Sequence, residues 1–335
     1  MFTRVLRIVV VALALAPALA AADPIKLKFS FFTSDRSAVY QQQVKPFIDA
    51  VNAEGKDLIH IDVYFSGAIS KLQSAQPELV SDGTADLALV VPGQSPEQFS
   101  NIAVLELPGL FRDSLEASRV FARLAAAKAL KGFDDYEVIG SFVSNGESIH
   151  SRKPLASLGE LNGQTIRVNN PIEAATLEKL GVVPVVLAIN ETMEKLSAGK
   201  IDGATLPPSM LFEFGIGRVT SHHYMMQLGG APIALVMNRD KFASLPPQAQ
   251  SIIRKYSDDW FAERAASGMA ALDQRILEEL KKDSRRTVTY PSQSDMAVIN
   301  EAYASVVADW ASSSRNNREL LERAKGEIAK LRSNN

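Results

Sequence analysis

Two stretches of this chain alternate short apolar strands with helices in the order β-α-β-α-β. The first runs from the alternating segment 25–32 to the apolar segment 85–91, and the second occupies residues 163–206. Alternation of this kind is typical of a parallel sheet that is covered by helices. Two such runs in one chain therefore predict an α/β protein with two similar lobes. A further apolar strand is expected at residues 233–237.

A long helical segment follows these strands. Residues 248–282 contain no proline and a single glycine, Gly268. At 1.5 Å per residue, one helix of this length would extend over roughly 50 Å, which exceeds the size of one small lobe. We therefore expect one long helix that bridges both lobes.

The first residues of the chain have the features of a secretory signal peptide. Arg4 and Arg7 supply a positive start, and residues 8–16 form an apolar segment that is too short to span a bilayer. A small-x-small cleavage site follows at residues 18–20. We predict that residues 1–22 are a cleaved signal peptide, the alternative being a buried N-terminal helix or an uncleaved anchor. Export without a lipid-bearing cysteine points to the periplasm of a Gram-negative bacterium.

The composition excludes several classes of function. The chain has 36 lysines and arginines against 38 aspartates and glutamates, and its formal net charge is −2. It lacks the basic excess that drives binding to nucleic acid. It contains no cysteine, which excludes disulfides, thiolate nucleophiles and cysteine-ligated metals.

The sequence offers no recognisable motif for catalysis, for a metal or for a cofactor. The neighbours His222 and His223 would face opposite sides of a strand, a poor geometry for binding one metal ion. His150 lies near Ser148 and Ser151, but it has no nucleophile-elbow motif and no obvious acid partner. We therefore expect no enzyme activity, no metal site and no cofactor. An ordinary surface or hinge role is the alternative for the histidines.

Seven short stretches match one known family in their order and spacing. They are residues 47–52 (FIDAVN), 78–90 (ELVSDGTADLALV), 105–113 (LELPGLFRD), 153–168 (KPLASLGELNGQTIRV), 180–184 (LGVVP), 191–203 (ETMEKLSAGKIDG) and 236–246 (VMNRDKFASLP). Any one of these matches by itself is weak evidence for the family. Together they resemble the substrate-binding proteins of tripartite ATP-independent periplasmic (TRAP) transporters, the DctP-like family.

The resemblance implies a two-lobed periplasmic binding protein fold of the α/β class, with mixed or parallel sheets flanked by helices and a long helix bridging both lobes. We expect residues 23–145 and about 233–270 in lobe I, and residues 146–232 and about 271–330 in lobe II. The lobes would close around a bound ligand by a hinge motion.

The resemblance also implies a function in transport. The protein would capture a small organic acid, a carboxylate, in the interlobe cleft and deliver it to an integral membrane permease with a small and a large subunit. It would act as a monomer in the periplasm. The alternatives are the binding protein of an ABC-type or sensor system for a small polar metabolite, and a periplasmic hydrolase or other enzyme.

Arg167 is the residue from which we expect the strongest ligand contact. It stands among apolar residues in the strand segment 165–168, where a lone arginine needs an anion. Its planar guanidinium can bind a carboxylate through two parallel hydrogen bonds. From the residues alone, a salt bridge to a protein acid, such as Glu191 or Asp202, is an equal alternative. The resemblance implies that Arg167 pairs with the carboxylate of the ligand between the lobes.

The other expected contacts come from alignment with the family. They are Phe32, Gln73, Gln94, Glu147, Asn170, Ile189 and Leu206. Leu206 stands where the family often carries a ligand-binding asparagine, and Glu147 stands where some members carry a second arginine. The pocket would then have one anion anchor and apolar walls, which favours a monocarboxylate with an apolar body.

Two of these positions have open alternatives. Glu147 would accept a hydrogen bond from a hydroxyl or amine of the ligand, or it would be a solvated charge at the end of a strand. Asn170, with its neighbour Asn169, would hold the second edge of the ligand carboxylate or Arg167 itself, or it would form a turn.

Overall fold

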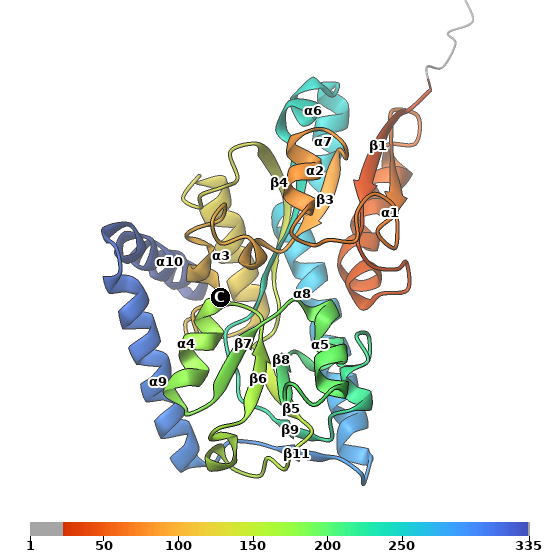
Figure 1. Cartoon of the computed structure of the whole chain (residues 1–335). Helices are drawn as coiled ribbons and strands as arrows, with labels where there is room; N and C mark the ends of the chain where they lie inside the picture. Colours follow the sequence, from red (N-terminus) through yellow and green to blue (C-terminus); the bar gives the residue numbers. More distant parts are fainter. Residues whose placement is uncertain (1–22, 334–335) are drawn as a thin grey trace, which may run out of the picture.

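Two separate β-sheets organise the chain, and helices flank both of them (Figure 1). The computed structural model describes residues 23–333. The predicted signal peptide, residues 1–22, lies outside the described residues. The two sheets and their helices form the two lobes that the sequence predicted, and we name them lobe I and lobe II in chain order.

The sheet of lobe I has the strand order β2-β1-β3-β10-β4. Its strands are β1 (Ile25–Ser30), β2 (Ile59–Tyr64), β3 (Leu87–Val90), β4 (Tyr136–Val143) and β10 (Pro232–Asn238). The first three strands pair in parallel, as the β-α-β-α-β pattern predicts. The late strand β10 inserts between β3 and β4 and is antiparallel to both, so the sheet is mixed.

The sheet of lobe II has the strand order β11-β9-β5-β8-β6-β7. Its strands are β5 (Ser148–Ser151), β6 (Thr165–Val168), β7 (Val183–Val186), β8 (Gly203–Leu206), β9 (His222–Tyr224) and β11 (Thr287–Thr289). β6 pairs in parallel with β7 and β8, whereas β5 runs antiparallel to β8 and β9. We did not predict β5 and β9, because their sequences SIHS and HHY are short and mostly polar.

Helices cover both sheets. They are α1 (Lys45–Glu54), α2 (Gln76–Ser81), α3 (Ser114–Ala126), α4 (Pro171–Lys179), α5 (Ile189–Ser197), α6 (Arg239–Ser244), α7 (Pro247–Lys255), α8 (Asp258–Lys282), α9 (Gln293–Ser312) and α10 (Arg315–Ser333). A π-helical turn (Tyr40–Val44) precedes α1, and 3₁₀ turns lie at Pro92–Gln94, Ile102–Leu105, Leu158–Leu161, Pro208–Met210 and Ile216–Arg218. Among the helices of residues 23–333, none combines the length and the apolar character needed to cross a bilayer.

The predicted long helix is divided in two. α7 ends at Lys255, Ser257 is extended, and Asp258 begins α8 with a positive φ of 48°. The Ser257 hydroxyl donates to the carbonyl of Ile253, four residues earlier, in the last turn of α7. The prediction of one unbroken helix over residues 248–282 is therefore wrong. α8 nevertheless has 25 residues, a length of about 37 Å.

α8 is the helix that bridges the lobes. It contacts α3 and β4 in lobe I, and it contacts the Pro208–Met210 turn and β11 in lobe II. In Figure 1 it descends from the upper lobe into the lower one. The bridging role expected of the long helix is thus confirmed for α8.

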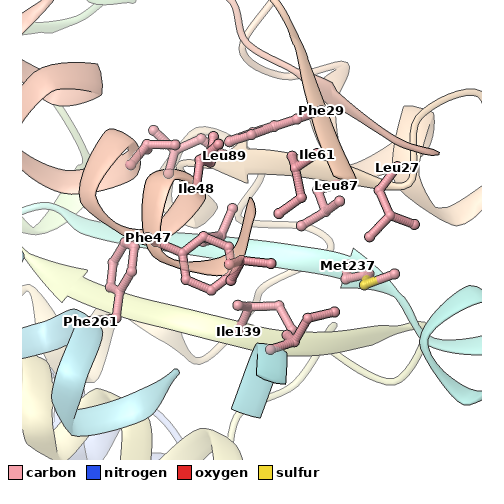
Figure 2. Close-up of a cluster of buried hydrophobic side chains, with 14 of the residues drawn as sticks. Leu27, Phe29, Phe47, Ile48, Ile61, Leu87, Leu89, Ile139, Met237 and Phe261 are labelled. Carbon is pink, nitrogen blue, oxygen red and sulfur yellow. The ribbon is translucent and has the colours of Figure 1, made fainter. Parts of the chain in front are cut away.

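The core of lobe I fixes the first half of α8. Figure 2 shows Phe261 of α8 beside Phe47 of α1, and their ring centroids lie 6.3 Å apart. A Cβ atom at Gly140 of β4 would lie only 2.5 Å from Cγ of Phe261. The phenyl ring therefore rests directly on the backbone of β4, where only glycine leaves room for it.

The last helix returns to lobe I. α10 packs on α3 (Figure 1). The guanidinium of Arg332 donates to both oxygens of Glu116 at 2.8 and 2.9 Å. The residue boundaries of the lobes stay a prediction. A division by these contacts would move the part of α10 that was expected in lobe II, residues 315–330, to lobe I.

Candidate functional site

A cavity of about 360 Å³ lies between the lobes. Lobe I contributes Phe32, Lys71 and Gln73, and lobe II contributes Ile189 and Phe214. The structure thus brings together three residues that the sequence analysis selected: Phe32, Gln73 and Ile189. Pockets of this size suit small organic ligands, and two phenyl rings with an isoleucine give this one an apolar wall.

Arg167 lies in β6, a strand with a partner on each side, and its side chain is 2% exposed. Its Nε donates to the carbonyl of Leu187 at 2.9 Å. One terminal nitrogen donates to the carbonyl of Thr205 at 3.0 Å, and the other to Oδ1 of Asn169 at 3.1 Å. All three acceptors are neutral oxygens. A guanidinium has five N–H bonds, so these contacts leave one N–H on each terminal nitrogen.

Neither of the two acids named as examples of a protein partner for Arg167 contacts it. Asp202 accepts from Lys153 at 2.8 Å and from the backbone N–H of Thr165 at 2.9 Å. Glu191 is exposed on α5. The acids whose charges act on Arg167 are instead Glu147 and Glu173.

Glu147 is buried, with 3% of its surface exposed. The alternative of a solvated charge at a strand end is therefore wrong. Burial, with the nearby carboxylate of Glu173, raises the pKa of Glu147 well above its usual range, against the pull of Arg167. A protonated carboxyl at this position would donate as well as accept hydrogen bonds.

Asn170 caps the N-terminus of α4 and is fully buried. Its Oδ1 accepts from the backbone N–H of Glu173 at 2.9 Å, and its Nδ2 donates to Oε1 of Glu173 at 3.1 Å. Both ends of the amide are thus engaged within its own turn. This geometry favours the turn-forming alternative for Asn170.

Gln94 connects lobe I to the surroundings of Arg167. Its Nε2 donates to the carbonyl of Asn169 at 2.9 Å and lies 3.2 Å from Oδ1 of the same residue. That Oδ1 also accepts from Arg167. Asn169 therefore holds Arg167, as one of the alternatives had it, and links it to Gln94 of lobe I.

Leu206 is buried at the end of β8, where its side chain joins an apolar cluster with Leu196, Ile201 and Ile216. Like Arg167, Gln94, Glu147 and Asn170, it is not among the residues that line the 360 Å³ cavity. Its backbone carbonyl accepts from Nε2 of His150 at 3.1 Å. The structure thus separates Leu206 from Phe32, Gln73 and Ile189.

The buried pair of His150 and His223 lies directly behind this strand end. The two Nδ1 atoms are 2.7 Å apart. Because Nε2 of His150 must donate to Leu206, its Nδ1 accepts, and Nδ1 of His223 must then donate. Nε2 of His223 is left as a buried acceptor without a hydrogen-bond partner among the described residues. This arrangement requires both rings to be neutral.

The histidine pair predicts a loss of stability in acid. Burial lowers the pKa of His150 to about 4 and, with repulsion from His150, that of His223 to about 2. In the unfolded chain these two histidines bind protons near pH 6.5. The stability that the neutral pair contributes to the folded state is therefore complete above that pH and is lost as the pH falls toward 4. We expect His150 alone to account for on the order of 3 kcal/mol of unfolding free energy between pH 7 and pH 4.

Denaturant unfolding at several pH values measures this effect. The double variant His150→Asn with His223→Asn keeps polar side chains but does not titrate, so its stability should depend less on pH. His60→Asn, at an exposed histidine, is the control and should follow the native protein. Equal pH dependence in the native protein and the double variant would show that the pair is not responsible.

Two buried acids near Arg167 escaped the sequence analysis: Glu106 and Glu173. Burial, with the charge of Glu173, raises the pKa of Glu106 to about 8. A lone acid between Leu105 and Leu107 was a signal for Glu106. For Glu173, the signal was its place three residues after the capping residue Asn170, the spacing of a capping box.

Comparison with known proteins identifies the family. The family model of bacterial extracellular solute-binding proteins, family 7 (DctP), matches residues 29–313. The C4-dicarboxylate-binding periplasmic protein DctP of Rhodobacter capsulatus is 26% identical over 258 residues, which are 75% of this chain and 77% of that protein. The 2,3-diketo-L-gulonate-binding periplasmic protein YiaO of Escherichia coli is 23% identical, over 84% of this chain and 86% of its own.

Solved structures share the whole fold. A TRAP solute-binding protein from Rhodoferax ferrireducens, in complex with copurified benzoate, is 26% identical, with a TM-score of 0.83 over 91% of this chain and 98% of that chain. A marine metagenome TRAP solute-binding protein with 3-hydroxybenzoate is 24% identical, with a TM-score of 0.85 over 92% of this chain and 99% of that chain. With the family model matched over most of its length, this chain belongs to family 7 of the bacterial extracellular solute-binding proteins, the DctP family of TRAP solute-binding proteins.

Proposed function

We propose that this protein is the periplasmic binding component of a TRAP transporter and captures a small organic acid between its lobes. The ligand has one carboxylate on an apolar body, and that carboxylate pairs with Arg167. Phe32, Ile189 and Phe214 contact the apolar body. Gln73, in the same cavity, makes a polar contact with the edge of the ligand.

The donor inventory of Arg167 carries this proposal. Its guanidinium is buried and oriented by three neutral oxygens, and one N–H remains on each terminal nitrogen. Two such N–H groups match the two oxygens of a carboxylate. Leu187, which accepts from Arg167, lies two residues before Ile189 of the cavity wall.

The charges around Arg167 and the ligand of one solved relative favour a monocarboxylate over a dicarboxylate. The Rhodoferax ferrireducens relative was solved with benzoate, which has one carboxylate on a ring. The Rhodobacter capsulatus relative is named for C4-dicarboxylates. In this chain the buried Glu147 and Glu173 lie beside Arg167, so a second ligand carboxylate there would meet like charge.

The family places the protein in a transport system. We propose that it is exported to the periplasm through cleavage of residues 1–22, acts as a monomer, and delivers its ligand to a small and a large integral membrane permease subunit. Closure of the lobes around the ligand would present the form that the permease recognises. The contact of Gln94 with Asn169 joins the two lobes near Arg167 and would form part of the closed state.

A thermal-shift screen tests the proposed ligand class. Mature protein, freed of copurified ligand by unfolding and refolding, is heated with benzoate, 3-hydroxybenzoate, butyrate and succinate. A ligand at 100 times its Kd should add about 2.7 kcal/mol of stability. We expect the aromatic monocarboxylates to raise the Tm most and succinate least. A screen in which only sugars or amines raise the Tm would contradict the proposal.

A further inference from the structure

Three buried glutamates form one charged cluster with Arg167: Glu147 and Glu173 act on its guanidinium, and Glu106 acts on those two acids. Glu106 follows the Ile102–Leu105 turn of lobe I, Glu147 precedes β5, and Glu173 lies in the first turn of α4. Their exposed fractions are 2%, 3% and 1%, and that of Arg167 is 2%. If all four side chains were ionised, the cluster would hold a net charge of two negative units away from water, which is strongly unfavourable.

Hydrogen bonds tie Glu173 to the backbone around Arg167. Oε2 of Glu173 accepts from the backbone N–H of Asn169 at 3.1 Å and from the hydroxyl of Thr205 at 2.5 Å. The carbonyl of Thr205 in turn accepts from Arg167. Glu173 is therefore the carboxyl of the cluster that is best supported as an ion, because two N–H groups, those of Asn169 and of Asn170 Nδ2, donate to its oxygens. The Thr205 hydroxyl lies within hydrogen-bond distance of both Glu173 and the carbonyl of Arg167.

The other two glutamates each have an oxygen with no protein partner. Oε2 of Glu147 and Oε1 of Glu106 are buried without a hydrogen-bond partner among the described residues. An ionised oxygen in that position would be costly, whereas a protonated carboxyl has a proton of its own to donate. The charged groups that act on Glu147 are Glu173 on α4, Arg167 on β6 and Glu106 in lobe I. Only one of these, Arg167, stabilises its ionised form.

The balance of charge therefore depends on what Arg167 pairs with. Without a ligand, the ionised carboxylate of the cluster is the counter-ion of the guanidinium. A ligand carboxylate that binds the two remaining N–H groups takes over that role and adds a negative charge beside the glutamates. A like charge at close range raises the affinity of a carboxylate for a proton.

We propose, on the basis of the proposed function, that the site binds its monocarboxylate together with one proton, which Glu173 takes up from solvent. The ligand enters as an anion, a new O–H bond forms on Glu173, and the net charge of the cluster is unchanged. A dicarboxylate would require a second proton or leave an uncompensated charge. The resulting ligand class is an organic acid with one ionised group.

Calorimetric titration of the native mature protein with benzoate and 3-hydroxybenzoate tests this inference. Each titration is run at pH 7 in phosphate and in Tris, whose ionisation enthalpies differ widely, and the difference in heat gives the number of protons bound. We expect uptake of up to one proton per ligand. We also expect affinity to fall between pH 6 and pH 8.5, approaching tenfold per pH unit where uptake is complete.

Two variants identify the group involved. Glu173→Gln should abolish the proton uptake and flatten the pH dependence of affinity. Glu116→Gln is the matched control, because Glu116 is equally buried but pairs with Arg332 on α10. It should bind with the proton uptake of the native protein.

The outcomes separate this inference from the proposed function. Binding of either acid with equal heats in both buffers and no pH dependence would overturn the proton-linked site and leave the proposed function standing. Absence of binding by both acids between pH 5.5 and 8.5 would overturn the proposed function, and the inference with it. Uptake that persists unchanged in Glu173→Gln would overturn the assignment to Glu173.

Discussion

Replacement of Arg167 by alanine is expected to lower the affinity for a bound monocarboxylate by about 30-fold to several-thousand-fold. Truncation of one partner of a buried, hydrogen-bonded charge pair typically costs about 2–5 kcal/mol of binding free energy. Arg167→Lys should lose part of this amount, because lysine keeps the charge but cannot present two parallel N–H groups. Calorimetric titration with benzoate at pH 6 measures the affinity of the native protein, Arg167→Ala and Arg167→Lys.

Folding must be checked alongside binding in these variants. Arg167→Ala also leaves the carbonyls of Leu187 and Thr205 without their donor, so its Tm and circular dichroism spectrum are recorded first. Arg332→Ala is the matched control, since it removes a bidentate arginine of α10 that lies at the contact with α3. If Arg167→Ala remains folded and binds as tightly as Arg332→Ala, Arg167 is not the anchor.

Replacement of Phe261 by alanine is expected to lower the unfolding free energy of lobe I by about 3–5 kcal/mol. Its ring is 1% exposed, packs near Phe47 and covers the backbone of β4 at Gly140 (Figure 2). The variant leaves a cavity that the sheet cannot close, because strands β10 and β4 hold their spacing through backbone hydrogen bonds.

Denaturant unfolding followed by far-UV circular dichroism measures this loss. Val298→Ala on α9, where the side chain is 50% exposed, is the control and should change stability by no more than about 0.5 kcal/mol. Similar midpoints for Phe261→Ala and Val298→Ala would show that the contact of α8 with β4 does not stabilise lobe I. The position of α8 matters for function, because the same helix continues into lobe II.

Part of the site could be predicted from the sequence. Phe32, Gln73 and Ile189 do meet in one cavity, and Arg167 is buried in a central strand of its sheet. These residues were found because the chain keeps the order and spacing of its family. Their roles as ligand contacts remain predictions for the titrations above.

The neighbours of Arg167 could not be predicted in the same way. The acids that act on it are Glu147 and Glu173, which come from separate segments, and Glu106 of lobe I interacts with both of them. No local pattern states which carboxyl will face which guanidinium. The spacing of Glu173 from Asn170 is that of a capping box, but this spacing predicts only where α4 begins.

The sequence by itself determined the two β-α-β-α-β units, because burial of one face of each helix and strand imposes a period that can be read locally. Only the tertiary structure decided that β10 inserts between β3 and β4, that α10 returns to α3, and that the chain bends at Ser257. It also decided that His150 faces His223 across two strands that the pattern did not reveal. Such pairings join residues far apart in the chain, and their energy depends on the partner and not on the local sequence.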